Sequence, residues 1–301
     1  MRQDFKIGVR RLCALFGKTR HAFYDKEWKL EEETVECAIV LKLVEEQRKV
    51  LPRVGTPKLH GLIQPSLAQH KIKMGIKKLH ELLSFYGMTV RRKRRKTITT
   101  FSKHWLKKYP NLIREVEVTY PEEVWVADIT YIALKNGFCY LSLLTDAYSR
   151  KIVGYCLHET LDRHGPLQAL AGACKNRLYL DHTVIHHSDR GIQYCCSDYI
   201  KYLKQESFMI SMTENGDPYE NAIAERVNGI LKDEFNLDRV FDTYAHAADE
   251  VSRVIPIYNC HRPHASCDFL TPDQAHQRRG KLKRRWKTYY KIRQHEEEIV
   301  S

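Results

Sequence analysis

The chain has 301 residues, of which 43% are hydrophobic, so it can bury at least one full-sized core, and this composition argues against wholesale disorder. Its formal net charge is +13. No apolar run is long enough to span a bilayer and no secretory signal is visible, so we expect a cytoplasmic protein with no membrane partner. Nine cysteines without a C-x-x-C pair agree with a reducing compartment.

The charge is unevenly distributed along the chain. Residues 1–110 contain 26 basic and 10 acidic side chains, and residues 276–301 contain 9 basic and 3 acidic ones. Residues 111–275 instead contain 15 basic and 24 acidic side chains. Basic ends predict a polyanion partner, and clustered carboxylates in the middle can hold a divalent cation.

The first predicted elements are two short helices within residues 9–28. Gly17 breaks the apolar pattern, and Thr19 can cap the second helix, which begins with Arg20 and His21. A helix, a short turn with glycine and a second helix with basic side chains are typical of a helix-turn-helix, although many helical hairpins share this pattern. On this interpretation Arg20 and His21 contact DNA.

Two small helical domains are expected before the acidic middle. A longer amphipathic helix over residues 31–51 completes the first, residues 1–51, and Pro52 ends it. The second, residues 52–110, has apolar residues at helical spacing, with Gly87 as a helix C-cap.

A basic run follows the second set of helices. Six of the seven residues from 90 to 96 are basic, so the run cannot pack into a core. It is either a solvated linker or a contact to DNA phosphates, and the helical units before it favour the second. The residues predicted to contact DNA here are Arg91, Arg92, Lys93, Arg94 and Arg95.

From about residue 120 the pattern changes to period-two alternation with β-branched residues. Three strands come first, with a hairpin signal at Asn136-Gly137 between the first two, and helices then alternate with strands. This order predicts an α/β fold with a mixed sheet. The expected strands are 124–134, 138–148, 151–157, 183–188 and 208–213, and the expected helices are 163–178, 196–207 and 219–235.

Three acidic residues stand at positions that suggest chemistry. Asp128 lies in the middle of the first strand, on the face of Val124 and Val126, where a carboxylate is costly unless a metal ion or another group compensates it. Asp189 ends a short apolar strand, the place where open α/β sheets bind ligands. Glu225 lies within a predicted helix.

One face of the helix that carries Glu225 is polar. Asn221, Glu225, Asn228 and Lys232 share one face, because they follow at intervals of three and four residues. A metal ligand with phosphate-contacting neighbours has this pattern. For Asn221 and Asn228 taken alone, we interpret the pattern as an ordinary solvated face.

The spacing of these acids resembles a known family. Thirty-five residues separate Asp189 from Glu225, and D…D-(35)-E on a strand, a strand end and a helix resembles the DDE transposases and retroviral integrases. Local motifs resemble bacterial insertion-sequence transposases, in particular the second-frame product of two-frame elements that move by copy-out–paste-in. These motifs are Trp125 with Asp128-Ile129-Thr130, His187-Ser188-Asp189-Arg190-Gly191, Tyr219-Glu220-Asn221-Ala222, Tyr258-Asn259, Arg262-Pro263-His264 and Leu270-Thr271-Pro272. Glu220 and Arg226 depart from the usual Asp and Ser.

The resemblance implies a ribonuclease-H-like catalytic core over residues 118–277. Asp128, Asp189 and Glu225 would be both catalytic and metal-binding residues, holding two Mg²⁺ or Mn²⁺ ions per active site. The implied partners are double-stranded DNA (the terminal inverted repeats of the element and the target), further copies of the chain bound to DNA, and a first-frame protein. Within the core, the further DNA-contacting candidates are Lys232, Asn221 and Arg262.

Several further interpretations concern the C-terminal residues, single side chains and the function of the whole chain. The basic residues 278–301 form either a DNA-binding helix or a helix that packs back on the core. We interpret His186 and His187 as structural donors, and Asp146 as the ion-pair partner of Arg150. For the whole chain, the rival hypotheses are a DNA-binding regulator without chemistry and a different ribonuclease-H-like nuclease.

Overall fold

A computed structural model describes residues 9–90, 105–214, 221–283 and 285. The chain divides into two compact units, residues 1–91 and residues 92–301. Among the described residues, no helix combines the length and the apolar character needed to cross a membrane.

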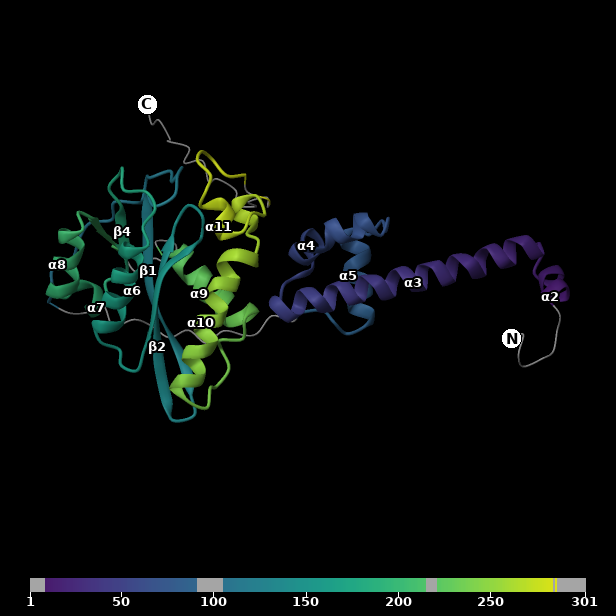
Figure 1. Cartoon of the computed structure of the whole chain (residues 1–301), viewed down its shortest axis with the longest axis horizontal. Helices are drawn as coiled ribbons and strands as arrows, with labels where there is room; N and C mark the ends of the chain where they lie inside the picture. Colours follow the sequence, from purple (N-terminus) through teal and green to yellow (C-terminus); the bar gives the residue numbers. More distant parts are fainter. Residues whose placement is uncertain (1–8, 91–104, 215–220, 284, 286–301) are drawn as a thin grey trace, which may run out of the picture. The chain divides into compact units, whose positions relative to one another are not determined.

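The first unit is helical (Figure 1). Its apolar side chains form a small core between the helices, with Val40, Val44, Leu59, Ile63 and Leu79 each at most 1% exposed. Its helices are α2 (Val9–Leu15), α3 (Arg20–Val50), α4 (Thr56–Gln69) and α5 (Ile76–Phe85).

The start of α3 confirms part of the prediction and corrects another part. Gly17 has a φ of +60°, and the Thr19 side chain accepts a hydrogen bond from the Ala22 N–H, as expected for a turn followed by a cap. The predicted separation between a short helix and a second helix from residue 31 was wrong. Helix α3 runs unbroken over 31 residues, because no glycine or proline interrupts it before Pro52.

The end of α5 confirms the predicted glycine C-cap. Gly87 has a φ of +66°, its N–H donates to the Ser84 carbonyl, and the Met88 N–H donates to the Leu83 carbonyl. This pair of bonds satisfies carbonyls that the helix end would otherwise leave without donors.

The second unit is built on a five-stranded mixed sheet with the order β3-β2-β1-β4-β5. β2 pairs in antiparallel fashion with β1 on one side and with β3 on the other, whereas β4 and β5 run parallel to β1. The predicted mixed sheet and its hairpin are confirmed, with Gly137 at a φ of +121°. The strands are β1 (Val124–Leu134), β2 (Gly137–Asp146), β3 (Ile152–His158), β4 (Ile185–Ser188) and β5 (Met209–Met212).

Helices cover both sides of this sheet. In Figure 1, α6, α7 and α8 lie on one side, and α9 and α10 lie on the other. The bounds of these elements are α6 (His164–Lys175), α7 (Ile192–Cys195), α8 (Ser197–Gln205), α9 (Ala222–Glu234), α10 (Tyr244–His261), the 3₁₀ turn η1 (Ala265–Cys267) and α11 (Pro272–Ala275).

The alternation in β1 divides the core into two layers. Trp125 and Ala127 belong to the large apolar cluster that includes residues of α6 and α8. Val124 and Val126 belong to a smaller cluster with Ala224 of α9. The predicted faces of β1 are therefore confirmed, and the face that continues to Asp128 is the one covered by α9.

The end of the described chain differs from the prediction. Residues 278–283, the start of the expected basic helix, have no helical structure. They instead make backbone contacts with the core, such as the Gly280 N–H to the Thr119 carbonyl at 2.7 Å. The remainder of the expected helix, residues 286–301, lies outside the described residues.

Candidate active site

The first two carboxylates of the site are brought together by strand register. β1 and β4 are parallel neighbours, and Ala127 pairs with Ser188. Asp128 and Asp189 are the residues that follow this pair on each strand. Because corresponding residues of parallel strands point to the same face, the two carboxylates are placed side by side on the α9 face of the sheet.

The third carboxylate comes from the first turn of α9. Glu225 is exposed there, and its N–H donates to the Asn221 carbonyl at 3.1 Å. The Asn221 side chain in turn donates to the Ala127 carbonyl at 3.3 Å. Asn221 therefore links the turn that carries Glu225 to the residue next to Asp128.

A second asparagine contacts the site directly. Asn228 lies one turn beyond Glu225, is 6% exposed, and donates from Nδ2 to Oδ2 of Asp128 at 2.7 Å. Asn221 is also buried, so the interpretation of both asparagines as a solvated face was wrong. Asn228 had been discounted, and its position three residues after Glu225, on the same helical face, is the signal that could have identified it.

The electrostatics of the site show that the three acids interact. Burial raises the pKa of Asp128 to about 7, and the charges of Asp189 and, more weakly, Glu225 act in the same direction. The hydrogen bonds from Asn228 and the Ile129 N–H oppose this rise, because they favour the ionised carboxylate. The site thus concentrates negative charge beyond what its own donors neutralise.

The loop after β4 is shaped around Asp189. The Gly191 N–H donates to Oδ1 of Asp189 at 3.0 Å. A Cβ at position 191 would lie only 3.0 Å from that same oxygen, which is tighter than ordinary contacts allow. Glycine at this position therefore lets the loop close over the carboxylate and hold it.

The histidines before Asp189 serve the core, as predicted. His186 Nε2 lies 2.9 Å from the Tyr199 hydroxyl, and burial lowers the pKa of His186 to about 3, so its ring is neutral. His187 Nδ1 lies 2.8 Å from Ser211 Oγ on neighbouring β5. Tyr199 belongs to α8 and Ser211 to β5, so each histidine ring connects β4 to a neighbouring element of the core.

The side chains of the described residues do not form a closed metal cage. Within residues 9–90, 105–214, 221–283 and 285, no three His, Cys, Asp or Glu side chains converge closely enough to hold an ion. The donor chemistry nevertheless suits a hard cation, since all three acids offer carboxylate oxygens. Glu225 is the acid whose exposed side chain has room to reorient.

Arg262 is corrected from a DNA-contacting residue to a structural one. Its side chain is 1% exposed. Its guanidinium donates to both oxygens of Glu234, with Nε–Oε2 at 2.9 Å and Nη2–Oε1 at 2.7 Å, and to the Pro263 carbonyl. This buried bidentate pair joins the end of α10 to the end of α9 and leaves no surface for DNA.

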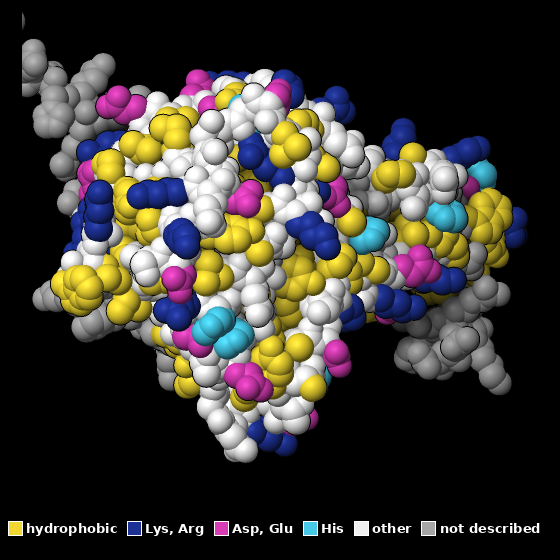
Figure 2. All heavy atoms as spheres, turned by 60° about the vertical axis from the view of Figure 1, so that its left-hand side comes forward, with side chains coloured by type: hydrophobic (Ala, Val, Ile, Leu, Met, Phe, Trp, Pro, Cys, Tyr) yellow, Lys and Arg dark blue, Asp and Glu magenta, His cyan; other side chains and the backbone are white. Residues whose placement is uncertain are grey.

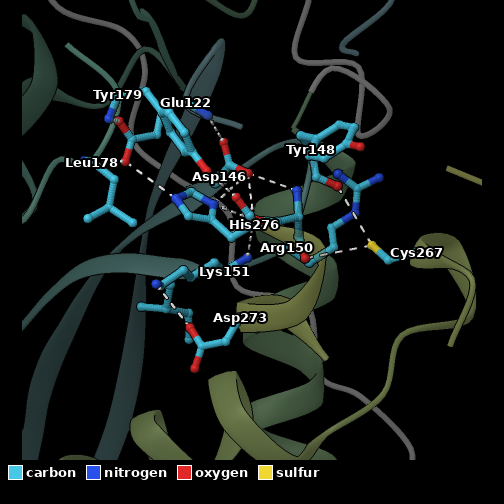
Figure 3. Close-up of polar contacts among 12 residues, drawn as sticks. Glu122, Asp146, Tyr148, Arg150, Lys151, Leu178, Tyr179, Cys267, Asp273 and His276 are labelled. Atoms are coloured by element: carbon cyan, nitrogen blue, oxygen red, sulfur yellow. Dashed lines mark hydrogen bonds and ion pairs between the residues drawn. The ribbon is translucent and has the colours of Figure 1, made fainter. Parts of the chain in front are cut away.

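Asp146 has structural partners within the core. It accepts hydrogen bonds from the Glu122 N–H, the Ser149 N–H and the Ser149 hydroxyl, and its Oδ2 lies 3.5 Å from His276 Nδ1. The predicted ion pair of Asp146 with Arg150 stays a prediction. Figure 3 shows the group of side chains around Asp146.

The remaining DNA-contacting candidates are distributed over several regions. Arg20 and His21 are exposed at the start of α3, and Lys232 is half-buried in the last turn of α9. Arg91 to Arg95 lie outside the described residues. On the face shown in Figure 2, the Lys and Arg side chains of the described residues are dispersed among acidic and apolar ones.

Comparisons with known proteins point to one family. Two integrase core domain models match residues 118–218 and 206–272. A 31-kDa protein of insertion element IS600 from Shigella sonnei is 31% identical over 268 residues, covering 87% of this chain and 96% of that protein. The transposase of element IS904 from Lactococcus lactis is 36% identical over 165 residues, covering 54% of this chain and 65% of its own length.

Solved structures give a weaker likeness. The catalytic core domain of HTLV-2 integrase, in a complex with magnesium, has a TM-score of 0.42 and 17% identity, covering 52% of this chain and 97% of that one.

The integrase core matches over residues 118–272 and the mixed sheet identify a polynucleotidyl transferase of the integrase core class. Within that class, the chain belongs to the insertion-element transposases, whose function is DNA transposition and integration.

Proposed function

We propose that Asp128, Asp189 and Glu225 are the catalytic carboxylates that cleave and join DNA at the terminal inverted repeats of an insertion element. One observation carries this proposal. Three acids from β1, the end of β4 and α9 interact closely enough that Asp189 and Glu225 both raise the pKa of Asp128. Such concentrated, partly buried negative charge is costly to the fold and is a mark of a functional site.

The residues fit Mg²⁺ or Mn²⁺, and we propose two ions per site. Asp128, Asp189 and Glu225 would hold them, with the exposed Glu225 side chain reorienting toward the two aspartates. Oδ1 of Asn221 and Oδ1 of Asn228 are buried acceptors that have no hydrogen-bond partner in the described structure. Water carried by a hydrated cation would supply the donors that these oxygens lack.

The chemistry follows from the reaction class. Asp128, Asp189 and Glu225 would hold the divalent ions, and the chemistry supplied there would be activation of water or of a DNA 3′-hydroxyl and stabilisation of the leaving oxygen. The protein's own part is to hold the carboxylates ionised and in place: Asn228 donates to Asp128, and the Gly191 N–H donates to Asp189. No nucleophilic side chain is needed. Lys232, about two turns beyond Glu225, would neutralise phosphate charge near the cleaved bond.

We further propose that the chain is the second-frame product of a two-frame element that moves by copy-out–paste-in. Joining two element ends requires more than one copy on DNA, and a first-frame protein is a further partner. The reaction would take place on cytoplasmic DNA. Arg20, His21 and the basic run from Arg91 to Arg95 would bind the DNA backbone, so affinity should fall steeply with salt, by roughly 0.9 log units in K per neutralised phosphate for each log unit of salt.

The test is cleavage and strand transfer on labelled DNA that carries the element's ends, with Mg²⁺ or Mn²⁺. Wild-type protein should nick and join the DNA, and Asp189→Asn should bind it without cutting. Asp198→Asn is the matched control, because Asp198 is an exposed acid at the start of α8 with only an ion pair to Arg163. Binding by the wild type without cleavage would instead favour a regulator, and cleavage of RNA–DNA hybrids without end preference would favour another nuclease.

A further inference from the structure

A second buried polar cluster lies at the edge of the catalytic core, apart from the proposed active site. It joins Glu122 just before β1, Asp146 at the end of β2, Ser149 in the following turn, and His276 just after α11 (Figure 3). All four residues are at most 1% exposed. Buried titratable groups are costly unless their hydrogen bonds are complete, so the cluster needs a specific protonation state.

The hydrogen bonds around His276 determine the protonation of one of its ring nitrogens, Nδ1. The Ser149 hydroxyl lies 2.5 Å from Oδ2 of Asp146 and donates its single hydrogen to that carboxylate. Ser149 Oγ also lies 3.0 Å from His276 Nδ1. Since the serine hydrogen is already used, the oxygen must accept in this contact, and Nδ1 must carry a hydrogen.

The other ring nitrogen faces Glu122. His276 Nε2 lies 3.3 Å from Oε1 of Glu122. The N–H groups of Leu178 and Tyr179 donate to Oε1 and Oε2 of this carboxyl, each at 3.0 Å. Burial raises the pKa of Glu122, but the hydrogen bonds from His276, Leu178 and Tyr179 outweigh burial and hold this pKa below its ordinary value, so the group is ionised. Nε2 must therefore donate as well. A histidine that donates from both nitrogens is an imidazolium cation.

The surrounding charges agree with a protonated ring. Arg177, after α6, places Nε 3.5 Å from Oε2 of Glu122, so two buried carboxylates face two cations. Burial by itself lowers the pKa of His276, but its hydrogen bonds with Asp146 and Glu122 outweigh burial and raise the pKa above the ordinary value. Lys151, which pairs with Asp273 of α11 at 2.9 Å, opposes the rise only weakly.

The cluster holds the segment that follows α11. The Tyr179 hydroxyl donates to the His276 carbonyl at 2.9 Å, and the Tyr148 hydroxyl donates to the Gly280 carbonyl at 2.8 Å. In the same segment, the Gly280 N–H donates a hydrogen bond to the carbonyl of Thr119, which precedes β1. Among the described residues 276–280, His276 has the only buried charged side chain. It therefore anchors this segment to the core.

We propose that protonated His276 is a pH-sensitive clasp that fastens the segment after α11 to the sheet and releases it as the pH rises. The neutral ring can donate from only one nitrogen, so deprotonation breaks one of the two bonds and leaves a buried carboxylate short of a donor. The folded-state pKa lies above the unfolded value. The stabilisation is therefore complete below the ordinary histidine pKa of about 6.5 and is lost as the pH rises through the folded value.

The first test is made on the full-length wild-type chain with ¹⁵N-labelled histidine. Between about pH 6 and about pH 9, the His276 ring should titrate from imidazolium to neutral above the ordinary histidine pKa. Amide hydrogen exchange of residues 277–283 should accelerate, about tenfold or more beyond the intrinsic pH effect, over the same range. A neutral His276 ring at pH 6, or exchange that follows only the intrinsic pH effect, would overturn the clasp.

Variants give an independent test. Glu122→Gln removes one carboxylate, so the midpoint of the exchange transition should move to lower pH, and an unchanged midpoint would contradict the proposal. His276→Gln should make the exchange of the segment fast and independent of protein titration. The matched control is His182→Gln: His182 Nε2 lies 3.1 Å from the backbone carbonyl of Glu122, and its Nδ1 lies 3.0 Å from Asp181, an acid outside the cluster. The control should keep the wild-type midpoint.

Discussion

Asn228 donates a 2.7 Å hydrogen bond from its side-chain amide to Oδ2 of Asp128, across 100 residues of sequence. The bond joins α9 to the middle of β1 and favours the ionised form of a carboxylate that burial would otherwise protonate. Asn221 makes a second connection between the same two elements through the Ala127 carbonyl. The helix that carries Glu225 is therefore tied to the strand that carries Asp128 on both sides of the acid.

Removing the first of these connections should weaken catalysis without removing a carboxylate. We expect Asn228→Ala to lower strand transfer and the apparent affinity for Mn²⁺ by about 10- to 100-fold, the range typical of residues that support metal ligands. Metal titrations of activity and of Mn²⁺ binding measure the two effects. The control is Asn176→Ala, an exposed asparagine at the end of α6. Equal losses in both variants would show that Asn228 has no special role.

The raised pKa of Asp128 predicts a pH-dependent cost to stability. The folded-state pKa is about 7, above the ordinary aspartate pKa of about 3.9, so the protonated form stabilises the fold and this contribution is lost as the pH rises through about 7. Asp128→Asn should therefore raise the melting temperature of metal-free protein at pH 8 and abolish activity. Thermal unfolding with and without Mg²⁺ tests this, since Mg²⁺ should stabilise the wild type and not the variant. A variant that melts below the wild type at pH 8 would contradict the sign.

The buried Arg262–Glu234 pair should be essential to the fold. We expect Arg262→Ala to lower the free energy of unfolding by about 3–5 kcal/mol, because it removes a buried cation that makes two hydrogen bonds to the Glu234 carboxylate. Arg253→Ala is the matched control, since Arg253 pairs with Glu250 on the surface and should change stability by only about 0–1 kcal/mol. Urea unfolding gives both values. Loss of DNA affinity without loss of stability would restore Arg262 as a DNA contact.

The packing of β3 against α6 depends on one glycine. A Cβ at position 154 would lie 2.2 Å from the Ala169 carbonyl oxygen and 2.7 Å from Ala173 Cβ, both on α6. Gly154→Ala should therefore force the helix away from the sheet and cost about 1–3 kcal/mol of unfolding free energy or more. Gly172→Ala, on the same helix, meets no atom within 4 Å and should instead stabilise by about 0.5–1 kcal/mol. Similar effects from both changes would show that the close approach is unimportant.

The sequence predicted the elements of the catalytic core well because their signals are local. Alternation in residues 124–134 gave β1 with its bounds and its two faces, and the periodicity around Glu225 gave α9. Three helices of the core were not predicted. α7 and α11 have four residues each, too few to show a period, and the 18-residue α10 carries Pro256 in its interior. The single helix α3 was predicted as two helices, although no glycine or proline separates the two parts of its sequence.

The sequence by itself determined which residues are the candidates for the chemistry: a mid-strand aspartate, a strand-end aspartate and a helical glutamate at fixed spacing. Only the tertiary structure decided which polar residues support them. Asn228 reaches Asp128 across 100 residues, His276 reaches Glu122 across 154, and Arg262 turns inward to Glu234. Periodicity is set by neighbouring residues and can be read from the chain. Contacts between distant residues depend on how the layers pack, and one sequence pattern is compatible with both a buried partner and a solvated side chain.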